Sequence, residues 1–150
     1  MDDPGLRDLD ELLRGLAPTI RPGQFVMVST NSLSSLPALA TVVEDEGTSL
    51  VIERHTADAF RLDYSEVFGW ITLTVHSSLA AVGLTAAVAG ALAVDGIPCN
   101  VLAGFHHDHL LVPTDRVDDA LSALAALSEG AAVRRPERVD GAGTDVGAPA

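Results

Sequence analysis

The stretch that most constrains the fold is residues 70–113, because strand and helix signals follow one another there without interruption. Residues 71–75 place an apolar side chain at every second position, which is the pattern of a half-buried strand. Residues 80–94 are apolar and rich in alanine over a length typical of a helix. Asp95 and Gly96 are expected to end this helix, since glycine tolerates the left-handed conformation at a helix end.

Two more strands are expected after the helix. Residues 97–102 and 109–112 have strand character, and residues 104–108 between them form a turn, so the two strands are expected to pair as a hairpin. Ser77 or Ser78 is expected to cap the helix at residues 80–94, which follows them, by accepting a hydrogen bond from a free backbone N–H. The predicted order is therefore strand, helix, strand, strand.

The first half of the chain shows similar helix and strand signals, but they are less regular. Leucines at three- and four-residue spacing predict an amphipathic helix over residues 6–16. The further elements expected here are a strand at 24–29, a hairpin of 38–44 with 49–53, and a short helix at 56–62 capped by Thr56. The first half is therefore interpreted as a diverged copy of the second.

The C-terminal part is expected to hold one helix and a tail. Thr114 is expected to cap a helix with an apolar face, which ends at Glu129 and Gly130. Residues 130–150 lose this periodicity and fill with glycine, proline and charge, so they are expected to form a flexible tail.

An ordered set of residues resembles the ACT domain, the small regulatory module of aspartate kinases. The set comprises residues 71–75, the turn His76, Ser77, Ser78 and Leu79, the helix residues Val82, Gly83, Leu84, Leu92 and Ala93, then Asp95, Gly96 and Ile97, and finally Asn100 and Val101. With residues 66–70 and 106–109, the chain looks like stand-alone bacterial proteins that carry two tandem ACT-like units. The acidic, Pro-Gly-containing turn usual in that family is replaced here by His-Ser-Ser-Leu, so the identity of a ligand does not transfer.

The resemblance implies an α+β, ferredoxin-like fold of βαββαβ units, with antiparallel sheets packed by helices on one face. It implies a diverged N-terminal ACT-like unit at 1–67, a C-terminal ACT domain at 68–129 and the tail at 130–150. The second unit has no evident fourth strand, and unpaired strand edges attract partners. We therefore expect the two halves to share strands or two copies to associate edge to edge, and we expect a homodimer.

Composition excludes several classes of partner. The formal charge of -12 argues against nucleic acid and against anionic membrane surfaces, both of which require basic patches. The acidic N-terminus is unlike a signal peptide, and residues 79–94 are too short to cross a bilayer, so no membrane contact is expected. The single cysteine, Cys99, excludes an internal disulfide framework and fits a reducing cytoplasm.

The run His106, His107, Asp108 and His109 contains the ligand types that zinc prefers. Consecutive strand residues point to opposite faces, so the four side chains cannot converge on one ion. His107 and His109 are expected to share a face, with a third ligand from His76 or His55. The favoured alternative is a polar hairpin turn, and neither a metal nor another cofactor is expected.

No catalytic set is expected elsewhere. Cys99 has no neighbouring base to lower its pKa, so a structural role is favoured. Ser77 and Ser78 lie beside His76, but adjacent residues cannot supply the geometry of a catalytic triad. The chain is therefore predicted not to be an enzyme.

The predicted ligand site is the turn and helix start at residues 76–84, where free backbone N–H groups suit a carboxylate. The resemblance implies that small amino acids bind where this turn meets the next strand. The matching residues are Ser77, Ser78, Leu79, Val82, Gly83, Asn100 and Val101. The alternative is that Ser77 caps the helix, Gly83 permits close packing and Asn100 lies at a strand edge.

Three functional hypotheses remain. The leading one is a non-catalytic regulatory protein that binds a small molecule, an amino acid by analogy with the family. The second is an oligomerisation or protein-interaction module without a ligand. A metal-dependent enzyme that uses His106 to His109 is the least favoured.

Overall fold

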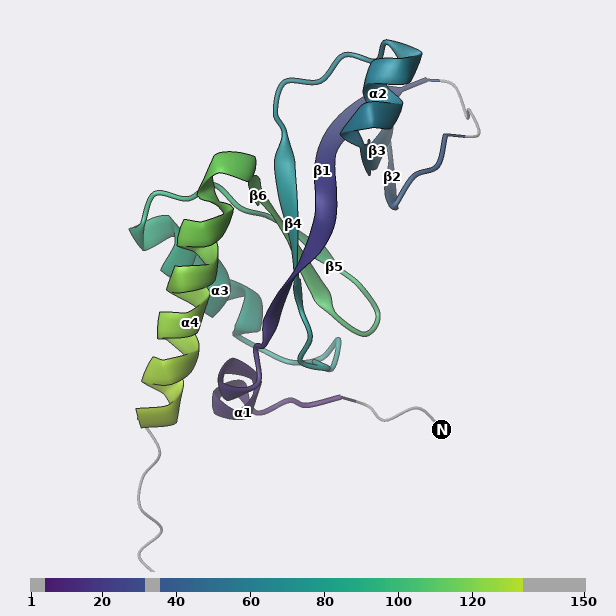
Figure 1. Cartoon of the computed structure of the whole chain (residues 1–150). Helices are drawn as coiled ribbons and strands as arrows, with labels where there is room; N and C mark the ends of the chain where they lie inside the picture. Colours follow the sequence, from purple (N-terminus) through teal and green to yellow (C-terminus); the bar gives the residue numbers. More distant parts are fainter. Residues whose placement is uncertain (1–4, 32–35, 134–150) are drawn as a thin grey trace, which may run out of the picture.

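The two halves of the chain share one antiparallel sheet. A computed structural model describes residues 5–31 and 36–133 (Figure 1). Its strands are β1 (Pro18–Thr30), β2 (Ala40–Glu44), β3 (Gly47–Glu53), β4 (Phe68–Leu73), β5 (Asn100–Ala103) and β6 (Asp108–Pro113), in the order β2-β3-β1-β4-β6-β5. Strand β1 of the first half pairs with β4 of the second. The expected sharing of strands between the halves is therefore confirmed.

The part of the chain that the structure describes also forms four α-helices. They are α1 (Leu9–Arg14), α2 (Arg54–Phe60), α3 (Leu84–Val94) and α4 (Val117–Val133), the last preceded by a 3-10 turn at Thr114–Arg116. Figure 1 shows α1, α3 and α4 grouped together beside the lower half of the sheet, and α2 at its other end. Mixed secondary structure on an antiparallel sheet confirms the α+β fold class.

The main core is built from both halves of the chain. Leu12, Leu13 and Leu16, at or near α1, are buried in one cluster with Val88 of α3 and Leu124 of α4. A separate cluster joins α2 to β1 and β3 on the same side of the sheet. The first-half helix α1 thus completes the core of the second half.

No helix formed by residues 5–31 or 36–133 covers the opposite face of the sheet. Alternation along β4 directs Ile71 toward the helices and Phe68 and Trp70 to the other side. Phe25 and Leu111 join Phe68 and Trp70 in a buried cluster there, and the Phe25 and Trp70 rings meet edge to face at 5.4 Å. This helix-free face spans the junction between the two halves.

Several predicted boundaries in the first half differ from the structure. The predicted hairpin is confirmed as β2 and β3, which are joined by a turn at Asp45 and Glu46. Strand β1 begins at Pro18, well before the expected residue 24, because a register shift between Arg21 and Phe25 accommodates Pro22 and Gly23 inside it. Thr56 is buried within α2 and does not cap it, since α2 begins at Arg54.

Helix boundaries in the second half also differ. Helix α3 begins at Leu84 rather than at residue 80, and Thr114 begins a 3-10 turn without capping it. Helix α4 continues through Gly130 to Val133, beyond its expected end. The first residues of the expected tail are therefore helical, and the remainder lies outside the described residues.

No helix within residues 5–31 and 36–133 is long and apolar enough to cross a membrane.

Gly90 offers a test of the α3 assignment. It lies inside α3, and a Cβ added to it would meet no atom within 4 Å. Gly90→Ala is therefore expected to raise the free energy of unfolding by about 0.5–1 kcal/mol, because alanine loses less backbone entropy in a helix. Urea denaturation measures the change, and a destabilised variant would contradict the open surroundings of Gly90.

Candidate functional site

The loop between β4 and α3 is held by the N-terminal segment. Leu6 forms a parallel bridge with Ser77: its N–H donates to the His76 carbonyl at 2.9 Å, and its own carbonyl accepts from the Ser78 N–H at 2.9 Å. The Ser78 hydroxyl then accepts from the Ala80 N–H at 3.2 Å. Neither serine caps α3, so the expected capping role is wrong; Ser78 stabilises the loop before the helix.

Helix α3 begins without a side-chain cap. The preceding Gly83 has φ +100°, a left-handed conformation, and a Cβ there would lie 3.0 Å from Leu9 Cδ2. In the described part of the chain, the first-turn N–H groups of Leu84, Thr85 and Ala86 have no hydrogen-bond partner. These groups carry the positive end of the helix dipole and suit an anion.

A pocket of about 100 Å³ opens at this helix start. We call it the α3 pocket, and its lining residues are Ser77, Ser78, Leu79, Ala81, Leu84, Thr85, Ala103 and Asp108. One wall of the pocket is the loop before α3. The other wall is the β5–β6 hairpin, in which Ala103 at the end of β5 pairs with Asp108 at the start of β6. The sheet therefore brings a carboxylate to the N-terminus of α3.

Asp108 is the ionisable group of this pocket. Burial raises the pKa of its carboxyl group above the usual value, and the neighbouring His109 and His107 oppose that rise. A partly desolvated carboxylate gains more than an exposed one from a cationic partner. One end of the α3 pocket thus favours an anion and the other a cation.

The structure separates the predicted ligand residues into two groups. Ser77, Ser78 and Leu79 line the α3 pocket, whereas Val82 is exposed and Gly83 sets the turn before the helix. Asn100 and Val101 lie away from it. Asn100 is exposed opposite Leu111 on the helix-free side of β5, and Val101 packs against the main core.

Sequence reasoning missed five residues of the pocket wall. The missed residues are Ala81, Leu84, Thr85, Ala103 and Asp108, which line the pocket but were not predicted as ligand residues. Asp108 carried a signal, because it lies in the histidine run that was already singled out. That signal was misinterpreted because the pairing of β5 with β6, which aims Asp108 at the helix, is not visible in the sequence.

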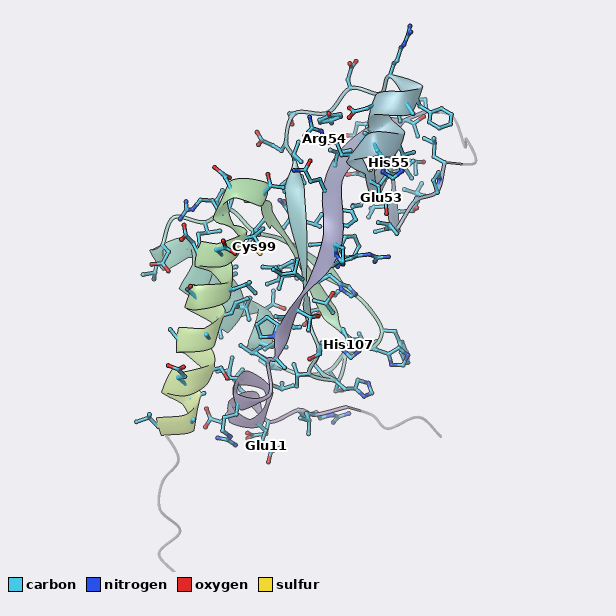
Figure 2. All side chains as sticks on the ribbon, viewed as in Figure 1. Glu11, Glu53, Arg54, His55, Cys99 and His107 are labelled. Atoms are coloured by element: carbon cyan, nitrogen blue, oxygen red, sulfur yellow. The ribbon has the colours of Figure 1, made fainter. Side chains whose placement is uncertain are left out.

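The expected pair of His107 and His109 is wrong. His109 packs edge to face against Trp70 at 5.3 Å on the helix-free side, and its Nδ1 lies 3.0 Å from Thr72 Oγ1. Burial lowers the pKa of His109. His107 lies instead at the hairpin end, visible in Figure 2, near His76 and His106. His55 contacts Glu53 at 3.0 Å in a different part of the chain.

Cys99 has a structural environment. It is partly buried against the main core, and burial raises the pKa of its thiol, which disfavours the reactive thiolate. Figure 2 shows Cys99 well away from His107.

A second cavity lies on the helix-free face. Its volume is about 150 Å³, and it is lined by Met27, Ala40, Val42, Glu44, Ser49, Val51 and Leu102. Leu102 comes from β5 and the others from β1 to β3, so both ends of the sheet contribute to this largely apolar groove.

Comparison with known families identifies two matches in tandem. Residues 4–69 match one family model of the ACT domain, and residues 66–126 match a second family model of the ACT domain. Together the two matches cover most of the chain. No protein of curated function matches it.

Solved structures agree with the family matches. A protein of unknown function from Vibrio cholerae, described as a possible transport protein, is 44% identical, with a TM-score of 0.73 over 80% of this chain and 95% of that one. The regulatory subunit of aspartate kinase from Thermus thermophilus is 7% identical, with a TM-score of 0.56 over 75% of this chain and 97% of that one. A putative regulatory domain of aspartate kinase from Porphyromonas gingivalis is 21% identical, with a TM-score of 0.52 over 73% and 94%. The last two similarities concern the fold.

Proposed function

The chain belongs to the ACT-domain family, and on that premise we propose that it is a non-catalytic sensor that binds a small amino acid in the α3 pocket. Both matched stretches are ACT domains, which are regulatory, and neither is a catalytic domain. The observation that carries the proposal is one pocket with unbonded helix N–H groups at one end and the Asp108 carboxylate at the other.

The charges of this pocket complement a zwitterion. The N–H groups of Leu84 and Thr85 are oriented to receive the α-carboxylate, as helix N-termini commonly do. Asp108 is positioned to accept from the α-ammonium group. The hydroxyl groups of Ser77 and Ser78 supply further polar contacts along the wall. A molecule that lacks the carboxylate would leave the helix N–H groups without a partner, and one that lacks the ammonium group would leave Asp108 without a partner.

Pocket size limits the ligand. A cavity of about 100 Å³ has room for about three water molecules by their share of liquid volume, which suits the smallest amino acids. The buried Leu84 and the half-buried Ala81 make part of the wall apolar, which favours a ligand with little additional polar surface. We therefore expect glycine, alanine or serine to bind in preference to large or charged amino acids.

Regulation follows from differential binding to two states. The backbone of Leu6 is hydrogen-bonded to the pocket wall around Ser77 and Ser78. A ligand that orders this wall therefore also stabilises the N-terminal segment. The N-terminal segment thereby offers a route from an occupied pocket to a partner or a second copy.

A thermal-shift screen with the twenty amino acids tests the proposal. A ligand at 100 times its dissociation constant stabilises the native state by about 2.7 kcal/mol, so a small amino acid is expected to raise Tm visibly. Asp108→Asn keeps the shape of the side chain and removes its charge, so it is expected to weaken binding about tenfold or more in calorimetric titration. Analogues that lack either the amino or the carboxyl group should bind more weakly still.

Two control variants make the result specific. Asp118→Asn removes an exposed carboxylate on α4, and Asn100→Ala changes the predicted ligand residue that lies on the other face. Both are expected to retain full binding. The proposal fails if no amino acid shifts Tm, or if Asp108→Asn binds as tightly as the unchanged chain.

An interaction module without a ligand is the second candidate. The helix-free groove favours it, because Met27 is 38% and Val42 53% exposed on an apolar surface that spans both ends of the sheet. Association of two copies through this face would produce the expected homodimer. Light scattering on the ligand-free chain separates the two candidates when the amino-acid screen is negative.

A further inference from the structure

Three imidazole rings gather where the β4–α3 loop meets the β5–β6 hairpin. The ring centres of His76 and His106 lie 5.4 Å apart, those of His76 and His107 6.4 Å, and those of His106 and His107 6.3 Å. We call this set the histidine trio. His76 comes from the loop, and His106 and His107 come from the hairpin turn, so two segments distant in sequence contribute.

These separations approach those of a metal site. With a zinc–nitrogen bond of about 2.0–2.1 Å, a ring centre lies about 3.2 Å from the ion, and tetrahedral angles place neighbouring ring centres about 5.3 Å apart. The His76–His106 separation already has this value, and the other two exceed it by about 1 Å. As the side chains of the described residues stand, no group of three or more histidine, cysteine, aspartate or glutamate side chains could hold a metal ion, so the proposed site requires side-chain rotation.

The surroundings permit that rotation. His106 is exposed, and His76 and His107 are half-buried, so solvent reaches the trio. The ring planes are inclined by 60°, 71° and 51°, and none of the pairs is stacked in parallel. Binding of an ion requires His76 and His106 to rotate about their side-chain bonds until their nitrogens face His107, and His106 must then leave its edge-to-face contact with Phe105 at 5.0 Å.

His107 is already held in the manner of a metal ligand. Its Nδ1 donates to the Val75 carbonyl oxygen at 3.4 Å, which leaves Nε2 available as a lone-pair donor. Metal-bound histidines usually make such a bond with the second nitrogen, because it fixes the tautomer and orients the ring. The backbone of the turn is held as well, since the Gly104 N–H donates to the His107 carbonyl at 2.9 Å.

We propose that His76, His106 and His107 bind a divalent transition-metal ion, with zinc as the test ion, and that water completes the coordination. Imidazole ligands suit zinc, copper and nickel, whereas calcium and magnesium require oxygen ligands. The ion would join the β4–α3 loop to the hairpin turn. This proposal does not depend on amino-acid binding in the α3 pocket, although His76 and His107 are the chain neighbours of the pocket residues Ser77 and Asp108.

Calorimetric titration of the full-length chain without an affinity tag, at about pH 7.5, tests this site with zinc chloride, because neutral imidazole is the binding form. A single zinc ion per chain is expected to bind. His76→Ala, His106→Ala and His107→Ala are each expected to weaken binding by about tenfold or more. Cobalt gives a second readout, since visible absorption distinguishes tetrahedral coordination from free aqueous ions.

His55→Ala and His109→Gln are the matched controls. His55 is exposed beside Glu53, and His109 packs against Trp70 on the opposite face, so neither substitution should alter zinc affinity. Circular dichroism with a chelator present verifies that each variant is folded. The proposal is overturned if zinc at millimolar concentration does not bind, or if folded trio variants bind as tightly as the unchanged chain.

Discussion

Leu16→Ala is expected to lower the free energy of unfolding of the whole chain by about 2–5 kcal/mol. Leu16 is fully buried and belongs to the core cluster that contains Val88 and Leu124. Truncation leaves a cavity in that cluster, although Leu16 belongs to the first half of the chain and most of the cluster to the second. The effect should therefore reach both halves.

Two probes of urea denaturation measure this effect. Far-UV circular dichroism follows the helices, and the fluorescence of the single tryptophan, Trp70, follows the helix-free face of the sheet. Both transitions are expected to shift together, because β1 pairs with β4 in a continuous sheet. Val43→Ala is the control: Val43 is 79% exposed, so its substitution should change stability by no more than about 0.5 kcal/mol. Separate transitions for the two probes would contradict a single cooperative unit.

Gly69→Ala is expected to destabilise the fold by about 1–3 kcal/mol through overpacking. Gly69 lies on β4 where the start of α4 crosses it, and an added Cβ would overlap Val117 Cγ2. Valine is stiff at χ1, so this methyl group cannot rotate away at low cost. The helix must then shift off the strand. Chemical denaturation of the variant measures the loss.

A double-mutant cycle identifies the contact responsible. Val117→Ala removes the clashing methyl group, so the variant that carries both substitutions is expected to be more stable than the sum of the single effects predicts. Gly90→Ala provides the control for glycine replacement itself, because its surroundings are open. If the effects of Gly69→Ala and Val117→Ala add within about 0.5 kcal/mol, the close approach to Val117 is not the cause.

Three of the eight residues that line the α3 pocket were predicted from sequence. Ser77, Ser78 and Leu79 were expected at the ligand site and line the α3 pocket, because a polar turn before an apolar helix is a local pattern. Local patterns gave the wrong result for two residues: Asn100 was predicted at the ligand site but lies on the other face of the sheet, and Asp108 lines the pocket but was not predicted. Each lies on a short strand, and which face it points to depends on the register of β5 against β6.

Local signals determined most of the elements of the fold. The turn Asp45-Glu46-Gly47 between two strand-like stretches predicted the hairpin of β2 and β3, and Asp95 and Gly96 predicted the end of α3, because these preferences act over a few neighbouring residues. The resemblance to the ACT domain rests on the same short-range patterns. Absence of an evident fourth strand in the second half also predicted that strands would be shared.

Tertiary structure alone decided where α3 begins and which side chains meet. Helix α3 begins at Leu84, after the expected residue 80, because Leu6 pairs with the loop at Ser77. The residues around Ser77 in the sequence do not indicate this bridge to Leu6. The histidine trio forms because the sheet places the hairpin turn beside His76, while pairing of His109 with Thr72 turns its ring to the other face. The sequence encodes these contacts, but they arise between residues far apart in the chain, where the free energy of packing and the strand register outweigh local preference.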